Sequence, residues 1–192
     1  EIIPGVPSCH CSTVQTLPDG RLIVAFFAGQ YEKAQDVAIY SCYGDATGTK
    51  WSEPRVIADT PNRSEGSPVF YLAPDKTLHL FFLTMHHGRI IKGGWSVCSV
   101  KHQISKDLGS TWSHPTYLRK KWFWVLRNRP IRLQNGYVVL PVHYEAGKMH
   151  SFFYINPKPD LSGKWVKSAK LNTPKGCDEI LPNSLDFQSE TM

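Results

Sequence analysis

Residues 105–112 of the chain read Ser105-Lys106-Asp107-Leu108-Gly109-Ser110-Thr111-Trp112, and this stretch decides the fold. A Ser and an Asp two residues apart can hydrogen-bond the backbone of a tight turn, and a glycine supplies a position with positive φ. The large ring of Trp112 can then anchor the hairpin by burial in a sheet. The pattern therefore predicts a turn between two antiparallel strands that is held by its own side chains.

Three further hairpin patterns recur along the chain at intervals of roughly 55 to 60 residues, with turns at Pro18-Asp19-Gly20, Pro74-Asp75-Lys76 and Gln134-Asn135-Gly136. Each turn lies between runs rich in Val, Ile, Leu and Phe, and Asp-Gly and Asn-Gly are strong hairpin signals. A second, more polar strand pair follows each hairpin and closes on Trp51, Trp112 or Trp165. Four strands in each repeat are typical of a propeller blade, so the expected fold class is all-β.

The quoted stretch resembles the Asp box of the sialidase-type β-propellers, the BNR-repeat family. Two other segments are similar to that family in the same order, HCSTVQTLPDGRLIVAFFAGQYEKAQDVAIY (residues 10–40) and RNRPIRLQNGYVVLPVHYE (residues 127–145). The resemblance covers about residues 10–181. It implies a six-bladed propeller of four-stranded antiparallel blades, with the Asp box as a structural staple on the outer rim.

We expect residues 1–192 to form a single, partial propeller domain with about three blades, at approximately residues 12–60, 67–118 and 128–172. Such a chain would self-associate or pair with a complementary half-propeller, because the end blades of an open propeller expose apolar faces. No apolar run is long enough for a membrane span. The sequence leaves the compartment open, with a secreted or periplasmic location favoured, and no signal peptide is present in this chain.

The charge balance favours an anionic partner. The net charge is +6, and the excess is concentrated in residues 119–132, RKKWFWVLRNRPIR, with six cations and no anion. No nucleic-acid-binding motif accompanies this run, so we expect an acidic glycan as the partner and not a nucleic acid. No cofactor is expected, and no metal, since His86-His87-Gly88 lacks a third ligand. Five cysteines without a C-x-x-C pair, among them Cys177, favour free thiols.

The resemblance implies that reactive side chains gather on the inner strands and at one end of the central channel. The catalytic candidates are Asp36, Glu32, Glu145 and Tyr144, and the substrate-binding candidates are His10, Asn128 and Arg129. A sialidase needs a carboxyl group as general acid/base, a Tyr activated by a Glu, and arginines that clamp a carboxylate. The family's Arg-Ile-Pro opening is absent, because Ile2-Ile3-Pro4 has no arginine, and His10 stands where that strand begins.

Each candidate also has a structural interpretation. Glu32 lies in a polar loop where a surface carboxylate is usual, Asp36 could cap a turn, and His10 could be a core histidine. The leading hypothesis is a sialidase-like exo-glycosidase that acts on a terminal acidic sugar. The alternatives are a polysaccharide lyase acting on a uronate polymer, with His10, Tyr144 and Arg129 in the reaction, and a non-catalytic glycan-binding propeller or an inactive fragment.

Overall fold

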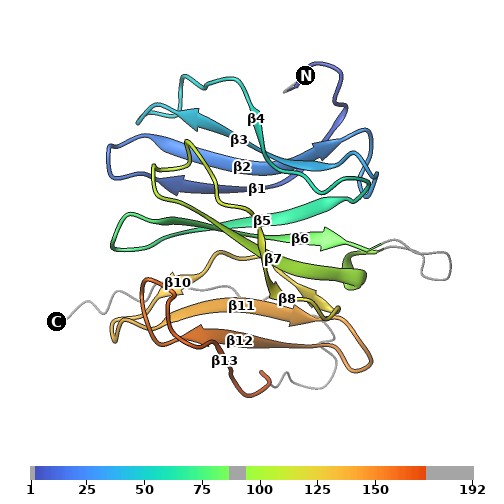
Figure 1. Ribbon diagram of the computed structural model, residues 1–192, viewed down its shortest axis with the longest axis vertical. Coiled ribbons are helices and arrows are strands. Elements are labelled where there is room, and N and C mark those ends of the chain that lie inside the picture. Colours follow the sequence, from blue (N-terminus) through green and yellow to red (C-terminus); the bar gives the residue numbers. More distant parts are fainter. Residues whose placement is uncertain (1–2, 87–93, 172–192) are drawn as a thin grey trace.

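The computed structural model describes residues 3–86 and 94–171; Cys177 and His87 lie outside them. These residues form three antiparallel sheets that lie one beside the next (Figure 1). The one helical segment in this part of the chain is a short 3-10 turn, η1 (Trp95–Val97), so none of the described helices is long and apolar enough to cross a membrane. The expected all-β class is confirmed.

Each sheet follows the chain order. The first contains β1 (Ser8–Thr16), β2 (Leu22–Gly29), β3 (Ala38–Gly44) and β4 (Arg55–Ala58). The second contains β5 (Glu65–Leu72), β6 (Leu78–Met85), β7 (Cys98–Ser105) and β8 (Thr116–Arg119). In the third, β10 (Ile131–Arg132), β11 (Val138–Tyr144), β12 (His150–Asn156) and β13 (Val166–Lys167) follow in order, and β9 (Trp124–Val125) also pairs with β11.

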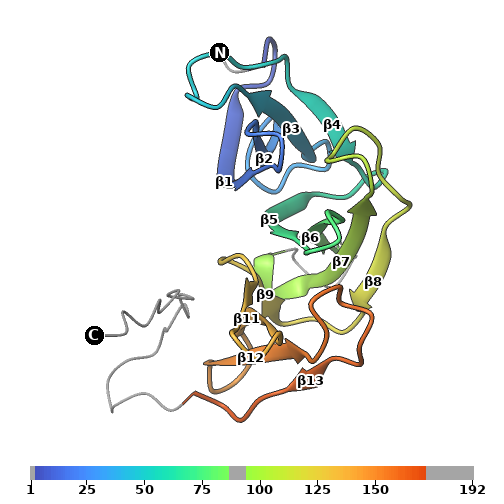
Figure 2. The ribbon, with the colours of Figure 1, turned by 90° about the vertical axis from the view of Figure 1, so that its left-hand side faces the viewer.

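The sheets are the blades of a propeller, and we call them the first, second and third blade. Seen along the sheets in Figure 2, they fan out so that β1, β5 and β9 lie on the concave side and β4, β8 and β13 on the convex side. In the third blade the innermost strand is divided, because β9 and β10 pair with opposite ends of β11. The prediction of about three four-stranded antiparallel blades is therefore confirmed, with one inner strand interrupted.

The three inner hairpins share one turn geometry, which the repeated sequence pattern predicts. In the second blade, Lys76 donates its backbone N–H to the Ala73 carbonyl oxygen, and Asp75 accepts from the backbone N–H of Thr77. Gly20 and Gly136 occupy the position of Lys76, and all three residues have positive φ, between 67° and 84°. A lysine therefore adopts the left-handed conformation that glycine provides in the other two turns.

The Asp box closes the outer hairpin of the second blade. Ser105 donates its hydroxyl to Asp107 (2.7 Å) and accepts the backbone N–H of Gly109 (2.7 Å). Asp107 also accepts the backbone N–H (2.8 Å) and the hydroxyl (2.6 Å) of Thr111. These hydrogen bonds, those from Thr111 first, lower the pKa of Asp107 to about 2. Trp112 is half-buried and lies parallel to Phe70, with ring centroids 6.2 Å apart.

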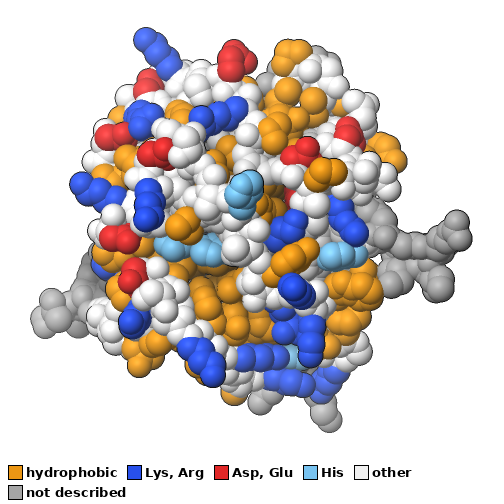
Figure 3. Space-filling model, viewed as in Figure 1, with side chains coloured by type: hydrophobic (Ala, Val, Ile, Leu, Met, Phe, Trp, Pro, Cys, Tyr) orange, Lys and Arg blue, Asp and Glu red, His pale blue; other side chains and the backbone are white. Residues whose placement is uncertain are grey.

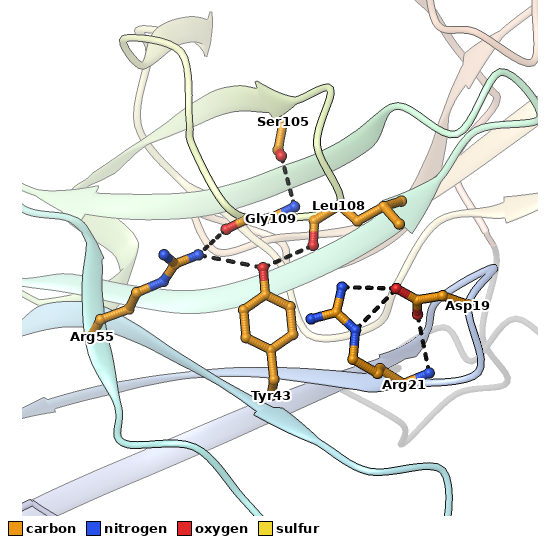
Figure 4. Close-up of polar contacts among 7 residues, drawn as sticks. All are labelled: Asp19, Arg21, Tyr43, Arg55, Ser105, Leu108 and Gly109. Atoms are coloured by element: carbon orange, nitrogen blue, oxygen red, sulfur yellow. Dashed lines mark hydrogen bonds and ion pairs between the residues drawn. The ribbon is translucent and has the colours of Figure 1, made fainter.

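The Asp box also joins the second blade to the first, as Figure 4 shows. The Tyr43 hydroxyl donates to the Leu108 carbonyl oxygen (3.0 Å), and the Arg55 guanidinium donates to the Gly109 carbonyl oxygen. A Cβ on Gly109 would lie 2.5 Å from Cδ1 of Ile23, so only glycine fits at this φ of 94°. The box therefore fastens neighbouring blades as well as its own hairpin.

The hydrophobic core consists of two layers between adjacent blades. Residues of β2 and β3 meet β5 and β6 in the first layer, where Ile23, Phe27, Phe70 and Phe82 are buried. The second layer lies between the second and third blades, and its largest buried side chains include Phe81, Met85, Leu126 and Phe152. Burial of apolar surface is worth about 25 cal/mol per Å², so these two layers hold the blades together.

Candidate active site at one end of the inner strands

The innermost strand of each blade has a break in its pairing with the next strand, and the three breaks occur at equivalent positions along the strands. The register shifts between His10 and Thr13 in β1 and between Gly66 and Val69 in β5. In the third blade the break is the gap between β9 and β10. Such bulges redirect side chains and are frequent beside active sites. The inner strands therefore carry irregular backbone on the concave side of the fan.

Two of these breaks meet across the concave side. Arg127, in the gap between β9 and β10, reaches the sulfur of Cys11 in the bulge of β1, with 3.9 Å between Nη1 and Sγ. Both side chains are exposed, and Cys11 has a positive φ of 50°. Arg127 is thus an arginine that sequence reasoning did not single out, although it adjoins the candidates Asn128 and Arg129. Asn128 is half-buried and Arg129 is exposed in the same gap.

Two of the catalytic candidates are held by adjacent residues of η1. The indole Nε1 of Trp95 donates to Glu32 Oε1 (2.6 Å), and the Ser96 hydroxyl donates to Glu145 Oε2 (2.7 Å). Glu32 follows β2 in the first blade and Glu145 follows β11 in the third, so one short segment of the second blade holds carboxylates from both neighbours. In Figure 1 these strand ends lie on the right-hand side.

The η1 segment is fixed by packing and by the backbone. The ring of Trp95 lies 5.3 Å from that of Phe27 and covers Gly66 so closely that a Cβ has no room there. The backbone of Phe123 joins Ser96 to Glu145, donating to the Ser96 carbonyl oxygen (2.8 Å) and accepting from the Glu145 N–H (2.9 Å). The two carboxylates are therefore preorganised by groups that are themselves held in place.

The other candidates have different surroundings. Asp36 accepts the backbone N–H of Gln30 (3.0 Å), which is the turn-capping contact that its structural interpretation predicts. His10 is exposed, with Nε2 2.9 Å from the Ser8 hydroxyl and its ring 5.5 Å from Phe27. Tyr144 is half-buried, with its ring 4.9 Å from that of His150 and 6.0 Å from that of Phe123.

A buried carboxyl group near this end was not predicted. Glu65, the first residue of β5, is fully buried and accepts the hydroxyls of Thr60 and Thr84. Lys101 donates to the Thr60 hydroxyl (2.6 Å), so one threonine bridges the two charged groups. Burial raises the pKa of Glu65 and lowers that of Lys101. This network lies at the contact between the first two blades, because the backbone N–H of Glu65 also donates to the Val37 carbonyl oxygen.

A cavity of about 570 Å³ occupies the other face of the first blade. Its lining includes Phe26, Trp51 and three cysteines, Cys9, Cys11 and Cys42. Burial raises the pKa of the Cys9 and Cys42 thiols, so neither is activated as a nucleophile there. Within the described residues, no group of three His, Cys, Asp or Glu side chains is placed to hold a metal ion.

Blades of antiparallel strands, an Asp box and carboxylates gathered at one end of the inner strands define a propeller of the sialidase type. The chain belongs to the family described as BNR repeat-like domain, which it matches over residues 20–190. None of the curated proteins compared with the chain matches it by sequence.

Solved structures show the same fold at low sequence identity. A protein of unknown function from Dyadobacter fermentans DSM 18053 has a TM-score of 0.73 and 17% identity, over 90% of this chain and 61% of that chain. The Hadza microbial sialidase Hz136 has a TM-score of 0.70 and 16% identity, over 86% and 38%. Zg3597, a family 117 glycoside hydrolase from Zobellia galactanivorans, has a TM-score of 0.64 and 16% identity, over 84% and 55%. The chain thus spans less than two thirds of the length of each.

Proposed function

We propose that the protein is a sialidase-like exo-glycosidase that hydrolyses the bond to a terminal acidic sugar. One observation carries the proposal: Glu32 and Glu145, from different blades, are held by the adjacent residues Trp95 and Ser96. Glycosidases use a pair of carboxyl groups on either side of the scissile bond. The solved neighbours include a sialidase and a glycoside hydrolase, which supports this choice among the functions that the fold can carry.

In this proposal one carboxyl group of the pair protonates the leaving oxygen, and the other carboxylate activates a water or stabilises the positive charge that develops on the sugar. Tyr144 and Glu145 are consecutive at the end of a strand, where side chains leave on opposite faces. We therefore assign the chemistry to the Glu32–Glu145 pair instead of a Tyr144–Glu145 pair. Arg127, Arg129 and His10 would bind the sugar's carboxylate, and Asn128 its hydroxyl groups.

The test is hydrolysis of fluorogenic glycosides of sialic and uronic acids by the full-length protein. We expect Glu32→Gln and Glu145→Gln each to lower kcat by about 10²–10⁴ with an unchanged melting temperature. The control is Glu53→Gln, which removes an exposed carboxylate of the first blade. Full activity in both site variants would contradict the assignment.

The same assay separates the other hypotheses. A lyase would release an unsaturated product that absorbs in the ultraviolet, whereas a glycan-binding propeller would bind the sugar and release nothing. Either outcome with the unmodified protein would overturn the proposed hydrolysis. Pairing with a second chain or with a complementary half-propeller remains a prediction, and sedimentation of the purified chain of residues 1–192 tests it.

A further inference from the structure

A second pocket adjoins the candidate active site. It has a volume of about 540 Å³, within the range of about 300–1,000 Å³ that is usual for ligand sites. Three consecutive cations and three aromatic residues line it: Arg119, Lys120, Lys121, Trp122, Phe123 and Tyr144. Phe123 and Tyr144 connect it to the candidate site, because the Phe123 carbonyl accepts from the Glu145 N–H and Tyr144 precedes Glu145.

The cations at this pocket have no anionic counterpart in its lining. The buried Nε of Arg119 has no hydrogen-bond partner among the described residues, and its guanidinium lies 4.1 Å from the centre of the Trp124 ring. Outside this lining, Lys167 of the third blade adds a further cation, with its ammonium 3.9 Å from the Phe152 ring. Burial lowers the pKa of Lys167, and the charges of Lys170 and Arg119 lower it further. These cations repel one another, so a bound anion would relieve the repulsion.

The surface around the pocket is also rich in Lys and Arg side chains. Figure 3 shows Lys and Arg side chains gathered in the lower right part of the molecule, over β8 and the ends of β11 and β12. On the upper part of this face, acidic and basic side chains alternate. On this face, Lys and Arg side chains are therefore gathered more densely over the lower part than over the upper part.

We propose that this pocket binds an anionic substituent, a sulfate ester or a carboxylate, on a second sugar of an acidic polysaccharide. Arg119, Lys120 and Lys121 supply the charge, and the half-buried Trp122 supplies an aromatic surface for a sugar ring. The position beside Glu145 rests on the proposed function and makes the pocket a subsite for the polymer. An acidic polysaccharide is favoured over a nucleic acid, because no nucleic-acid-binding motif accompanies these cations in the sequence.

The test is a binding measurement that needs no hydrolysis. The full-length protein is titrated with dextran sulfate, polygalacturonate and neutral dextran, and Trp fluorescence and calorimetry report binding. We expect the two anionic polymers to bind, dextran not to bind, and the affinity to fall with added salt, because screening weakens exposed charges. The polymer that binds more tightly identifies the substituent as sulfate or carboxylate.

Lys120→Glu/Lys121→Glu should weaken binding roughly tenfold or more, since each exposed ionic contact is worth a factor of a few. Lys50→Glu/Lys106→Glu is the matched control, with the same change in net charge at exposed lysines on outer turns of the first two blades. The site variant should keep its melting temperature and its hydrolysis of a small fluorogenic glycoside. A second variant, Trp122→Ala, tests the aromatic surface.

Three results would overturn the inference: no binding of either anionic polymer, equal weakening by the control pair, or tighter binding of single-stranded DNA that the Lys120/Lys121 variant abolishes. If the Lys120→Glu/Lys121→Glu variant loses polymer binding but still hydrolyses the small glycoside, the subsite and the proposed function are confirmed together. Polymer binding by a protein that hydrolyses no glycoside confirms the pocket and contradicts the proposed function.

Discussion

Arg55 of the first blade donates a hydrogen bond to the carbonyl oxygen of Gly109 in the Asp box of the second blade. The same guanidinium lies 3.3 Å from the Tyr43 hydroxyl and over the Tyr43 ring, and Arg21 covers that ring as well. The turn that the sequence pattern predicts as a local staple is therefore part of a contact between blades (Figure 4). Because of this contact, substitutions at Arg55 in β4 should affect the Asp-box turn, which lies more than fifty residues further along the chain.

Tyr43→Phe should lower the free energy of unfolding by about 1–2 kcal/mol, because it removes the donor to the Leu108 carbonyl and the acceptor for Arg55. Urea denaturation of the full-length protein measures the loss. Tyr117→Phe is the control, since Tyr117 is exposed in β8. Equal effects of the two changes would show that the contact between blades contributes nothing.

Gly109→Ala should lower the free energy of unfolding more than Gly136→Ala does. Both glycines have a strongly positive φ, 94° and 83°, so both substitutions carry a conformational cost of about 1–2 kcal/mol. A Cβ at Gly136 has nothing within 4 Å, whereas at Gly109 it meets Ile23 at 2.5 Å. The difference between the two variants, expected at about 1–3 kcal/mol, measures the packing of the Asp box against the first blade. Equal losses of stability would contradict this packing.

Two stacked histidines, the buried His79 and the half-buried His102, should make the second blade sensitive to acid. Nδ1 of His79 lies 2.9 Å from Nε2 of His102, and the rings stack with centroids 5.1 Å apart. Burial lowers the pKa of His79 to about 4 and that of His102 to about 3. The folded protein then binds fewer protons than the unfolded chain, whose histidines titrate near 6.5, so stability falls as the pH falls from about 7 towards 4.

The measurement is the free energy of unfolding at pH 7 and at pH 5. Each of the two histidines should lower this free energy by about 1–2 kcal/mol between pH 7 and pH 5. In the double variant His79→Phe/His102→Phe the change between the two pH values should be smaller by that amount. His114→Phe, at an exposed position, should leave the pH dependence as it is. An unchanged slope in the double variant would contradict the buried neutral pair.

Trp95→Phe should lower the rate of hydrolysis more than it lowers stability. Phenylalanine retains an aromatic ring against Gly66 and Phe27 but cannot donate a hydrogen bond to Glu32. We expect kcat for an acidic fluorogenic glycoside to fall about tenfold or more, with a small change in KM, because the carboxyl group is no longer oriented. A loss of activity that follows the loss of melting temperature would indicate a structural role alone.

The hairpin turns and the Asp box could be predicted from the sequence, because the residues that form each of them are close together in the chain. The turns at Asp19, Asp75 and Asn135 are confirmed because the signal and the hydrogen bond lie within five residues. The Asp box is predictable for the same reason, since Ser105, Asp107 and Thr111 satisfy one another. In the third blade the box pattern is eroded, and Asn156 holds the turn instead by donating to the carbonyl oxygens of Leu161 and Gly163.

The site was only partly predictable, because its contacts join residues far apart in the chain. Glu32 and Glu145 are candidates because each follows a predicted inner hairpin, but the sequence does not indicate the segment that unites them. Trp95 and Ser96, which hold the two carboxylates, belong to a 3-10 turn that precedes β7. Glu65 has no signal in the sequence either, since a carboxylate before an apolar run is usually exposed.

The interrupted inner strands also bear on how such a protein could change its specificity. Antiparallel pairing continues on both sides of each interruption, although its register shifts, and residues such as Cys11, Ser67 and Arg127 lie in these interruptions. Substitutions there would change the side chains on the concave side while leaving the strand pairs on either side in place. For protein engineering, the three interruptions are places where side chains on the concave side could be exchanged one blade at a time.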